Sequence, residues 1–264
     1  MAAVSTPDGA APPTRLPARV WAGIFVRLLA VQGSWSYERM AGNGIAFCIE
    51  PALRLLPGGV GGDAYRAALA REAGFFNAHP YLAAVAVGAL ARAELEGEPA
   101  ARIDRFRTAL CGPLGSVGDQ LVWAGWLPFC SVLALGAFGL GAGPGAAVAI
   151  FLLVYNAGHL ALRAWGLQTG WEHGTRVAAA LNTPVLRGGP QHLARAVALV
   201  GGVAVPVALD RLAAPGGAGR EFAIAAAVFA GAVVLARTHG RVHGWQLALG
   251  VLAALVLFSV ARNG

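Results

Sequence analysis

Residues 120–162 read QLVWAGWLPFCSVLALGAFGLGAGPGAAVAIFLLVYNAGHLAL, and none of these 43 residues is Asp, Glu, Lys or Arg. The GLGAGPG segment at residues 139–145 divides the stretch into two apolar segments, about 120–138 and 146–162. A helix needs about 20 apolar residues to cross a hydrocarbon core about 30 Å thick. The stretch therefore predicts two membrane-spanning helices joined by a short glycine-rich loop.

Three more apolar segments follow, at about residues 193–209, 222–236 and 245–261. The first two are short for a full crossing. A tilted helix, extension of the helix into neutral flanking residues, or shielding by a neighbouring protein would accommodate their length. Residues 81–91 form a shorter apolar run that predicts a re-entrant or half-membrane segment. The predicted fold class is therefore all-α: a polytopic membrane protein with broken or re-entrant helices and a largely helical N-terminal part that faces the cytoplasm.

The composition agrees with a membrane protein. The chain has 264 residues, of which 57% are hydrophobic and 12% charged, and its mean hydropathy is +0.61. A soluble domain is about one quarter charged, and disordered chains are polar and charged. Both classes are excluded for the chain as a whole. The three cysteines contain no CxxC pair, which excludes a disulfide framework and a cysteine zinc site.

The net charge of +7 lies mainly in the second half of the chain. Residues 1–128 carry 11 Arg and 10 acidic residues, whereas residues 129–264 carry 9 Arg and 3 acidic residues. The excess falls in short loops between apolar segments, as in the cytoplasmic loops of membrane proteins. Nucleic-acid binders instead gather cations on one face or in an arm, so we expect no nucleic-acid partner. The basic loop 237–244 is placed inside, which predicts the N-terminus inside and the C-terminus outside.

Three regions are expected along the chain. Residues 1–18 are rich in Ala and Pro and predict a disordered tail. Residues 19–111 predict an N-terminal region of amphipathic and re-entrant helices, and residues 112–264 predict the membrane-spanning region. Within the first region, residues 92–107 are the most charged stretch, and we expect them in water.

The QGSWSYERM stretch, residues 32–40, is the densest polar and aromatic motif. If it is helical, Gln32, Trp35 and Arg39 share one face, with Glu38 near Trp35. Aromatic rings beside amide and carboxylate groups suit a sugar, because its CH faces stack and its hydroxyls hydrogen-bond. An interfacial Trp/Tyr belt with an internal Glu38–Arg39 pair is the alternative.

The FFNAHPY stretch, residues 75–81, joins two aromatic residues to Asn77 and His79. Pro80 biases His79 to extended geometry and favours a helix start immediately afterwards. A half-helix beginning there would direct its N–H groups at a ligand, as in broken-helix transporters. The alternative is a capped helix start with a buried histidine. The spacing around His79 does not favour a metal site, and we expect no metal and no cofactor.

Two further groups lie at the start and end of the apolar stretch. GPLGSVGDQLVW, residues 112–123, predicts a re-entrant turn before a membrane helix, with Asp119 either pairing with Arg39, binding a hydroxyl or serving as an anion on the helix dipole. Asn156, His159 and Arg163 are spaced three and four residues apart, so they share one helix face that should meet protein or polar solvent. Hydrogen bonds between helices would explain that face equally well.

Taken in order, these motifs resemble the IID subunit of the mannose/fructose/sorbose family of the phosphoenolpyruvate-dependent sugar phosphotransferase system. The resemblance covers about residues 19–260. It is carried by WSYERM at 35–40 with Gly44 and by FFNAHP at 75–80. It is also carried by GPL at 112–114, GD at 118–119 and Trp123, and by a later region with Asn156 and Arg163. This chain departs from the family pattern at Ala41, Ala78 and Ser116. The residues expected to form the structural motif are Pro80, Gly112, Pro113, Gly118, Trp123, Asn156 and Arg163.

The resemblance implies a non-phosphorylated, non-catalytic permease subunit of the bacterial inner membrane. It implies that a IIC subunit forms the path for a hexose together with this chain, that a IIAB protein phosphorylates the sugar, and that IIC–IID units assemble into a higher oligomer in the lipid bilayer. A regulatory or scaffolding paralogue and a general secondary transporter are the alternatives. The residues expected at the substrate path or the IIC contact are Gln32, Trp35, Glu38, Arg39, Asn77, His79 and Asp119.

Overall fold

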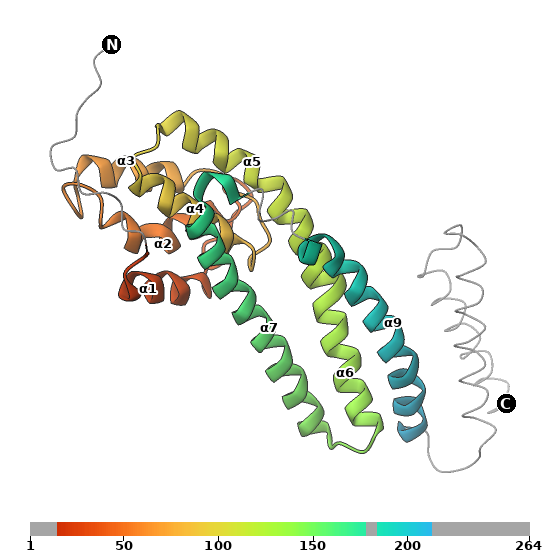
Figure 1. Cartoon of the computed structure of the whole chain (residues 1–264). Helices are drawn as coiled ribbons and strands as arrows, with labels where there is room; N and C mark the ends of the chain where they lie inside the picture. Colours follow the sequence, from red (N-terminus) through yellow and green to blue (C-terminus); the bar gives the residue numbers. More distant parts are fainter. Residues whose placement is uncertain (1–14, 178–183, 213–264) are drawn as a thin grey trace. The chain divides into compact units, whose positions relative to one another are not determined.

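The computed structural model describes residues 15–177 and 184–212, and within these ranges the chain forms helices and no β-strand (Figure 1). The all-α prediction is confirmed. The chain divides into two compact units. Of the described residues, the first contains 15–131, 148–177 and 184–197, and the second contains 132–147 and 198–212.

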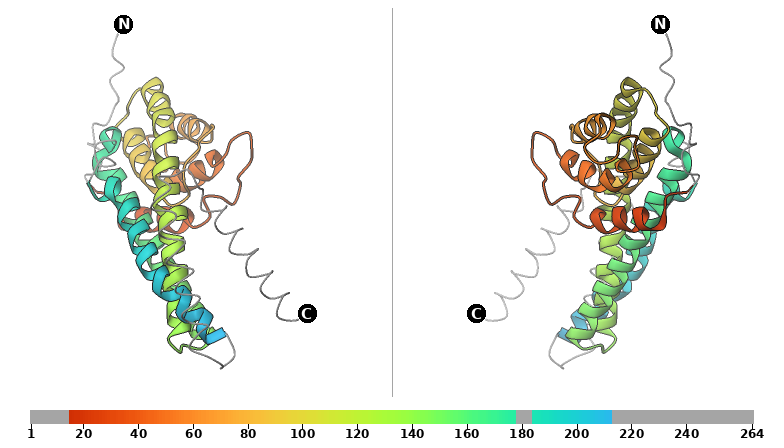
Figure 2. Two further views of the ribbon diagram at one scale, coloured as in Figure 1. Left: turned by 90° about the vertical axis from the view of Figure 1, so that its right-hand side faces the viewer. Right: turned by 90° about the vertical axis from the view of Figure 1, so that its left-hand side faces the viewer.

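Three short helices open the first unit: α1 (Ala18–Leu28), α2 (Gly42–Leu53) and α3 (Asp63–Glu72). Helix α1 begins directly after Pro17, whose carbonyl accepts hydrogen bonds from the Val20 and Trp21 amides. Its buried residues, Ile24 and Leu28, are four apart and therefore share the face that packs on the core. Figure 2 shows α1, α2, α3 and α4 gathered together.

Helix α4 (Ala83–Leu95) is the centre of the first unit, since 11 of its residues are buried. An apolar helix that is buried on all sides needs protein around its whole circumference. It crosses α7 very closely: a Cβ on Gly88 would lie 2.7 Å from the Trp171 amide nitrogen, and a Cβ on Gly170 would lie 2.9 Å from the Ala89 amide nitrogen. The run predicted at residues 81–91 is thus a helix surrounded by protein.

One continuous helical rod, Ala100–Gly139, is long and apolar enough to cross a membrane. It consists of α5 (Ala100–Gly118), a π-helical segment η1 (Asp119–Trp126) and α6 (Leu127–Gly139). The prediction of a re-entrant turn within residues 112–123 is wrong, because α5 continues through Gly112 and Pro113 and the π-helix follows it directly. The irregularity lies just beyond, in the π-helix, a rare form found frequently at functional sites.

Two more candidate membrane spans are Pro144–Arg176 and Leu186–Leu212. They correspond to α7 (Pro144–His173) with the short 3₁₀ helix η2 (Gly174–Arg176), and to α9 (Pro184–Leu212). The spans predicted near 120–138, 146–162 and 193–209 are therefore confirmed as helices, and the loop between the first two falls at Leu140–Gly143 as expected. The segments predicted at 222–236 and 245–261 lie outside the described residues.

In the second unit, the end of α9 is tied to the end of α6. Arg211 donates hydrogen bonds to the carbonyls of Phe138 and Ala142. Its guanidinium carbon also lies 4.3 Å from the centroid of the Phe138 ring. The carbonyls at the end of a helix have no partner within it, so Arg211 supplies one for α6.

Candidate functional site

The WSYERM motif forms a tight loop. The prediction that Gln32, Trp35 and Arg39 share a helical face is wrong, since residues 29–41 contain only turns and isolated bridges. The Met40 amide donates to the Ser36 carbonyl at 2.7 Å, and Met40 has φ +50°, a left-handed conformation that β-branched and bulky residues rarely adopt. Gly and Ser at positions 33, 34 and 36 favour such turns over a helix.

The loop exposes its polar and aromatic side chains. Gln32, Trp35, Glu38 and Arg39 are all exposed. The Trp35 ring lies edge-on to Tyr37, with their centroids 4.8 Å apart. An aromatic pair beside a carboxylate and a guanidinium is thus presented outward from the first unit.

The FFN motif is held against this loop by its backbone. The Phe76 amide donates to the Arg39 carbonyl at 3.2 Å, and the Ala41 amide donates to the Phe76 carbonyl at 2.9 Å. Phe76 is buried and anchors the segment, whereas Phe75 and Asn77 on either side are exposed. The structure therefore brings together the first two motifs, which are almost 40 residues apart in sequence.

His79 is buried, with 2% of its surface exposed. Its ring centroid lies 5.0 Å from those of Tyr81 and Trp123. It also lies against Gly118: a Cβ there would be 2.5 Å from Cγ of His79, so only glycine fits without displacing the ring. The second and third motifs meet at this contact.

The hydrogen bonds of His79 define its protonation. Its Nδ1 accepts the Tyr81 amide proton at 3.2 Å, so the neutral ring carries its own proton on Nε2. Nε2 is buried and has no hydrogen-bond partner within the described part of the chain. Burial lowers the pKa of His79 to about 4; Asp119 opposes this change and Arg163 adds to it. His79 is therefore a neutral hydrogen-bond donor at physiological pH.

Asp119 is exposed and begins the π-helix. It acts on His79 through its charge. The pairing of Asp119 with Arg39 is not among the ion pairs of the described residues. Four residues further along the π-helix, Trp123 leaves 45% of its surface exposed while its ring contacts His79.

The predicted polar face of α7 is confirmed. Asn156 Oδ1 lies 2.8 Å from Nε2 of His159, and Nδ1 of the same ring lies 3.0 Å from Nη1 of Arg163. Arg163 is buried, donates through Nε to the Leu28 carbonyl at 3.3 Å and lies 4.2 Å from the Tyr81 ring centroid. The face thus joins α7 to the end of α1 and to the residues after Pro80.

Tyr81 connects these groups. Its hydroxyl lies 2.6 Å from the Tyr155 hydroxyl, and its ring stacks on His159 with centroids 5.0 Å apart. It also borders a mainly apolar cavity of about 200 Å³. The other residues that line the cavity are Leu121, Val122, Trp126, Gly158, His159, Leu162 and Leu193.

Comparison with known proteins identifies the family of the chain. The family whose sequence model matches residues 16–207 is described as the PTS system mannose/fructose/sorbose family IID component. The chain belongs to this IID family.

Individual relatives agree. The mannose-specific EIID component of Escherichia coli (strain K12) is 33% identical to this IID chain over 160 residues, 58% of this chain and 54% of the relative. The sorbose-specific EIID component of Klebsiella pneumoniae is 31% identical over 172 residues, 62% of this chain and 60% of the relative. The alignments thus span little more than half the length of these curated relatives.

Two solved structures are similar. The cryo-EM structure of the mannose transporter ManYZ with microcin E492 matches with a TM-score of 0.55 and 28% identity, covering 73% of this chain and 71% of that one. A second structure, described as a membrane protein, shares the fold with a TM-score of 0.65 and 24% identity, covering 94% of this chain and 98% of that one. Together with its three apolar helices, these likenesses make this IID chain a membrane protein.

The motif residues of this IID chain now divide into two groups. The first group surrounds His79 and Tyr81 and consists of Gly118, Trp123 and Arg163 together with His79 itself. The second group lies on the adjoining WSYERM loop and FFN segment, and includes Arg39 and Asn77. Within the described ranges, no hydrogen bond or ring contact joins Gln32, Trp35 or Glu38 to His79. A methyl group on Gly112 would meet nothing within 4 Å. Close packing therefore does not explain why position 112 is a glycine.

Tyr81, Tyr155 and Trp126 belong to the site but are not among the residues predicted from the sequence. Tyr81 directly follows His79 and Pro80, which was the available signal. Tyr155 directly precedes Asn156 of the predicted polar face, which was a second signal, whereas Trp126 stands in an apolar stretch of the sequence. The Trp126 Nε1 lies 3.4 Å from the Tyr155 carbonyl, so both belong to the same contact between η1 and α7.

Proposed function

We propose that this chain is the membrane subunit of a phosphoenolpyruvate-dependent sugar phosphotransferase permease. With a IIC subunit it forms the path by which a hexose enters the cell, and a IIAB protein phosphorylates the hexose on arrival. Membership of the IID family supports the proposal, as do the names of the relatives, which are components specific for mannose and sorbose.

The observation that carries the proposal is the unpartnered Nε2–H donor of His79 beneath the partly exposed Trp123. A hexose presents CH faces that stack on aromatic rings and hydroxyls that accept and donate hydrogen bonds. A buried donor without a partner costs about 1–3 kcal/mol. A bound hydroxyl oxygen would remove that cost, which favours a sugar over an apolar ligand.

The other motif residues receive roles on the same basis. Asn77 and Glu38 offer exposed amide and carboxylate groups for hydroxyls or for IIC, and Gln32, Trp35 and Arg39 flank them on the loop. The charge of Asp119 opposes the lowering of the His79 pKa that burial causes. None of these residues is a phosphate carrier in this proposal, because phosphoryl transfer lies with IIAB.

Neutrality of the His79 donor also fits coupling to phosphorylation. A phosphate monoester carries about −1.5 to −2 charges at neutral pH. The phosphorylated hexose therefore needs cationic partners that the neutral imidazole and the aromatic rings do not supply, and Arg163 is already engaged by the Leu28 carbonyl, His159 and the Tyr81 ring. The product would leave on the inner side and not return through the site.

The proposed assembly is a higher oligomer of IIC–IID units in the bacterial inner membrane, with the N-terminus inside and the C-terminus outside. In this arrangement residues 19–111 supply the motif-bearing region and residues 112–264 supply the membrane-spanning region. The apolar spans of α6, α7 and α9 support insertion.

The proposal is tested by uptake in membrane vesicles from cells that lack other hexose phosphotransferase permeases. The full chain is expressed with its cognate IIC and IIAB proteins, and accumulation is measured across a panel of labelled hexoses. We expect uptake that requires phosphoenolpyruvate and this chain and that yields phosphorylated sugar. Sugar flux without phosphoenolpyruvate would indicate a secondary transporter, and uptake unaffected by omitting the chain would indicate a scaffold.

A further inference from the structure

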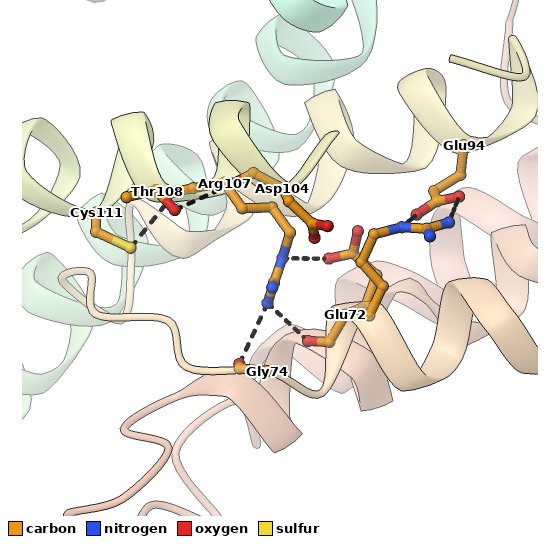
Figure 3. A network of polar contacts seen from close by, with 8 residues as sticks. Glu72, Gly74, Glu94, Asp104, Arg107, Thr108 and Cys111 are labelled. Atoms are coloured by element: carbon orange, nitrogen blue, oxygen red, sulfur yellow. Dashed lines mark hydrogen bonds and ion pairs between the residues drawn. The ribbon is translucent and has the colours of Figure 1, made fainter. Parts of the chain in front are cut away.

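Figure 3 shows a cluster of charged side chains inside the first unit. Arg71 on α3 makes two hydrogen bonds of 2.8 Å to the Glu94 carboxylate on α4. Glu72 on α3 and Arg107 on α5 lie beside them, and their side chains are 0% and 7% exposed. Charged groups are rarely buried so completely unless they have a specific partner.

The bonding of Arg107 is directed mainly at the backbone. Its Nη2 donates to the Glu72 carbonyl at 3.0 Å and to the Gly74 carbonyl at 3.2 Å. Its guanidinium carbon lies 5.6 Å from the centroid of the buried Phe76 ring. One side chain of α5 therefore holds three points of the segment from Glu72 to Phe76.

The Glu72 carboxylate contributes less to this arrangement. Its Oε2 lies 3.0 Å from Arg107 Nε, yet neither carboxylate oxygen has a hydrogen-bond partner in the described part of the chain. Burial raises the pKa of Glu72 to about 8 and Glu94 adds to the rise, whereas Arg107 and Arg71 oppose it. The two backbone carbonyls are thus the hydrogen-bonded partners of Arg107, and the Glu72 carboxylate lies beside the guanidinium as an ion pair.

The segment held by Arg107 leads directly into the candidate site. Phe76 forms the two backbone hydrogen bonds that hold the WSYERM loop, and Arg39 of that loop reaches the Ala73 carbonyl at 3.5 Å. Asn77 and His79 follow within three residues. A displacement of the segment would therefore move both motifs together.

We propose that Arg107 is a positioning residue for the sugar site: its guanidinium fixes the segment from Glu72 to Phe76, and through Phe76 it sets the relative positions of the WSYERM loop, Asn77 and His79. This inference rests on the proposed function. Arg107 touches no substrate in this account and acts only through the backbone that it holds.

The chemistry of the side chain explains why arginine is needed. A planar guanidinium presents several donors in a fixed fork, whereas a lysine ammonium is a single point of charge on a flexible stem. Lysine at position 107 would keep the charge beside Glu72 but lose the simultaneous bonds to two carbonyls. Glutamine at position 72 would remove the charge pair but leave both carbonyls in place.

Four variants of the full chain, expressed with IIC and IIAB, separate these contributions. R107K removes the fork. G74A places a methyl group 3.1 Å from Arg107 Nη1 and 3.1 Å from the Arg71 carbonyl, so that the guanidinium must shift slightly. E72Q tests the ion pair. R105K is the matched control, because Arg105 is exposed on the same helix.

Two measurements are made on each variant. The first is the KM and Vmax of sugar uptake, with the amount of inserted complex measured in parallel. The second is hydrogen exchange of the amides of residues 72–79 in the purified complex, which needs no transport.

We expect R107K to raise KM about tenfold, the factor for about 1.4 kcal/mol, with Vmax per inserted complex unchanged and faster exchange at residues 72–79. G74A should change both quantities in the same direction to a smaller degree, and E72Q and R105K should leave both unchanged. A loss of Vmax alone, or unchanged exchange in both R107K and G74A, would overturn the positioning role. If the wild type shows no phosphoenolpyruvate-dependent uptake, the proposed function fails, and exchange still decides whether Arg107 holds the segment.

Discussion

Replacing Gly118 by alanine is the sharpest perturbation of the site. The new Cβ would lie 2.5 Å from Cγ of His79 and even closer to its Cβ. Ordinary contacts are about 3.5–4 Å, so either the ring or the backbone of α5 must move by about 1 Å. The atoms involved adjoin the His79 backbone, so rotation of the side chain cannot relieve the clash. Overpacking of this kind costs about 1–3 kcal/mol.

Helix propensity alone predicts the opposite sign. Alanine is favoured over glycine by about 1 kcal/mol inside a helix. The variant G115A on the same helix isolates this effect of helix propensity, because a Cβ at Gly115 would meet nothing within 4 Å. We therefore expect G115A to be neutral or stabilising, and G118A to be less stable than G115A by about 1–3 kcal/mol, the cost of the overpacking, because both variants gain the same helix propensity.

The assay combines thermal unfolding of the purified complex in detergent with sugar uptake. G118A should melt at a lower temperature than G115A, and the part that inserts should take up sugar with a raised KM because the Nε2 donor is displaced. Equal stability and equal KM in the two variants would refute the packing of His79 against α5.

Three further outcomes are expected. Burial lowers the pKa of His79 to about 4, so between pH 6.5 and 4 the unfolded chain binds a proton that the folded chain does not. The free energy of unfolding should therefore decrease by up to about 3 kcal/mol as pH drops from 6.5 to 4. Unfolding of H79Q measured against pH should lack this decrease. E38Q and N77A should abolish uptake while leaving membrane insertion intact, and normal uptake by both would remove these residues from the site. G88A should destabilise the complex by about 1–3 kcal/mol, because the added Cβ would meet the backbone of α7. G145A is the control and should not destabilise it, because a Cβ at that position meets nothing within 4 Å. Similar melting temperatures of the two variants would contradict the close α4–α7 crossing.

The membrane spans and the polar face of α7 were predictable because each depends on a local pattern. Apolarity over about 20 residues predicts a span without knowledge of the neighbours. Residues three and four apart share a helix face whatever packs against it, so the row from Asn156 to Arg163 followed from spacing alone.

The shared face of Gln32, Trp35 and Arg39, which depended on a helix at residues 32–40, is wrong because contacts with distant residues decide the shape of that segment. Its shape depends on the left-handed Met40 and on backbone hydrogen bonds to Phe76. Gly33, Ser34 and Ser36 favour turns, but the sequence of residues 32–40 does not reveal the contact with Phe76. The need for glycine at position 118 likewise comes from His79, 39 residues earlier.

The charged stretch 92–107 was expected in water, and this is wrong for two of its members. Glu94 and Arg107 are buried against α3. Charge density in a sequence indicates solvent exposure only on average, and a buried pair needs partners that come from other helices. Arg71 and Glu72 on α3 supply them.

The central claim is that the Nε2–H group of His79 donates to a hexose, and equilibrium binding tests it directly. Labelled hexose is titrated into the purified complex of this chain with IIC, without IIAB, for the wild type, H79Q and H79N. Glutamine can place an N–H donor near the position of Nε2, whereas asparagine can replace only the Nδ1 acceptor for the Tyr81 amide. The account predicts that H79Q retains most of the affinity and that H79N loses about tenfold or more, the effect of one missing hydrogen bond to a buried group. Equal affinity in H79N and the wild type would contradict it.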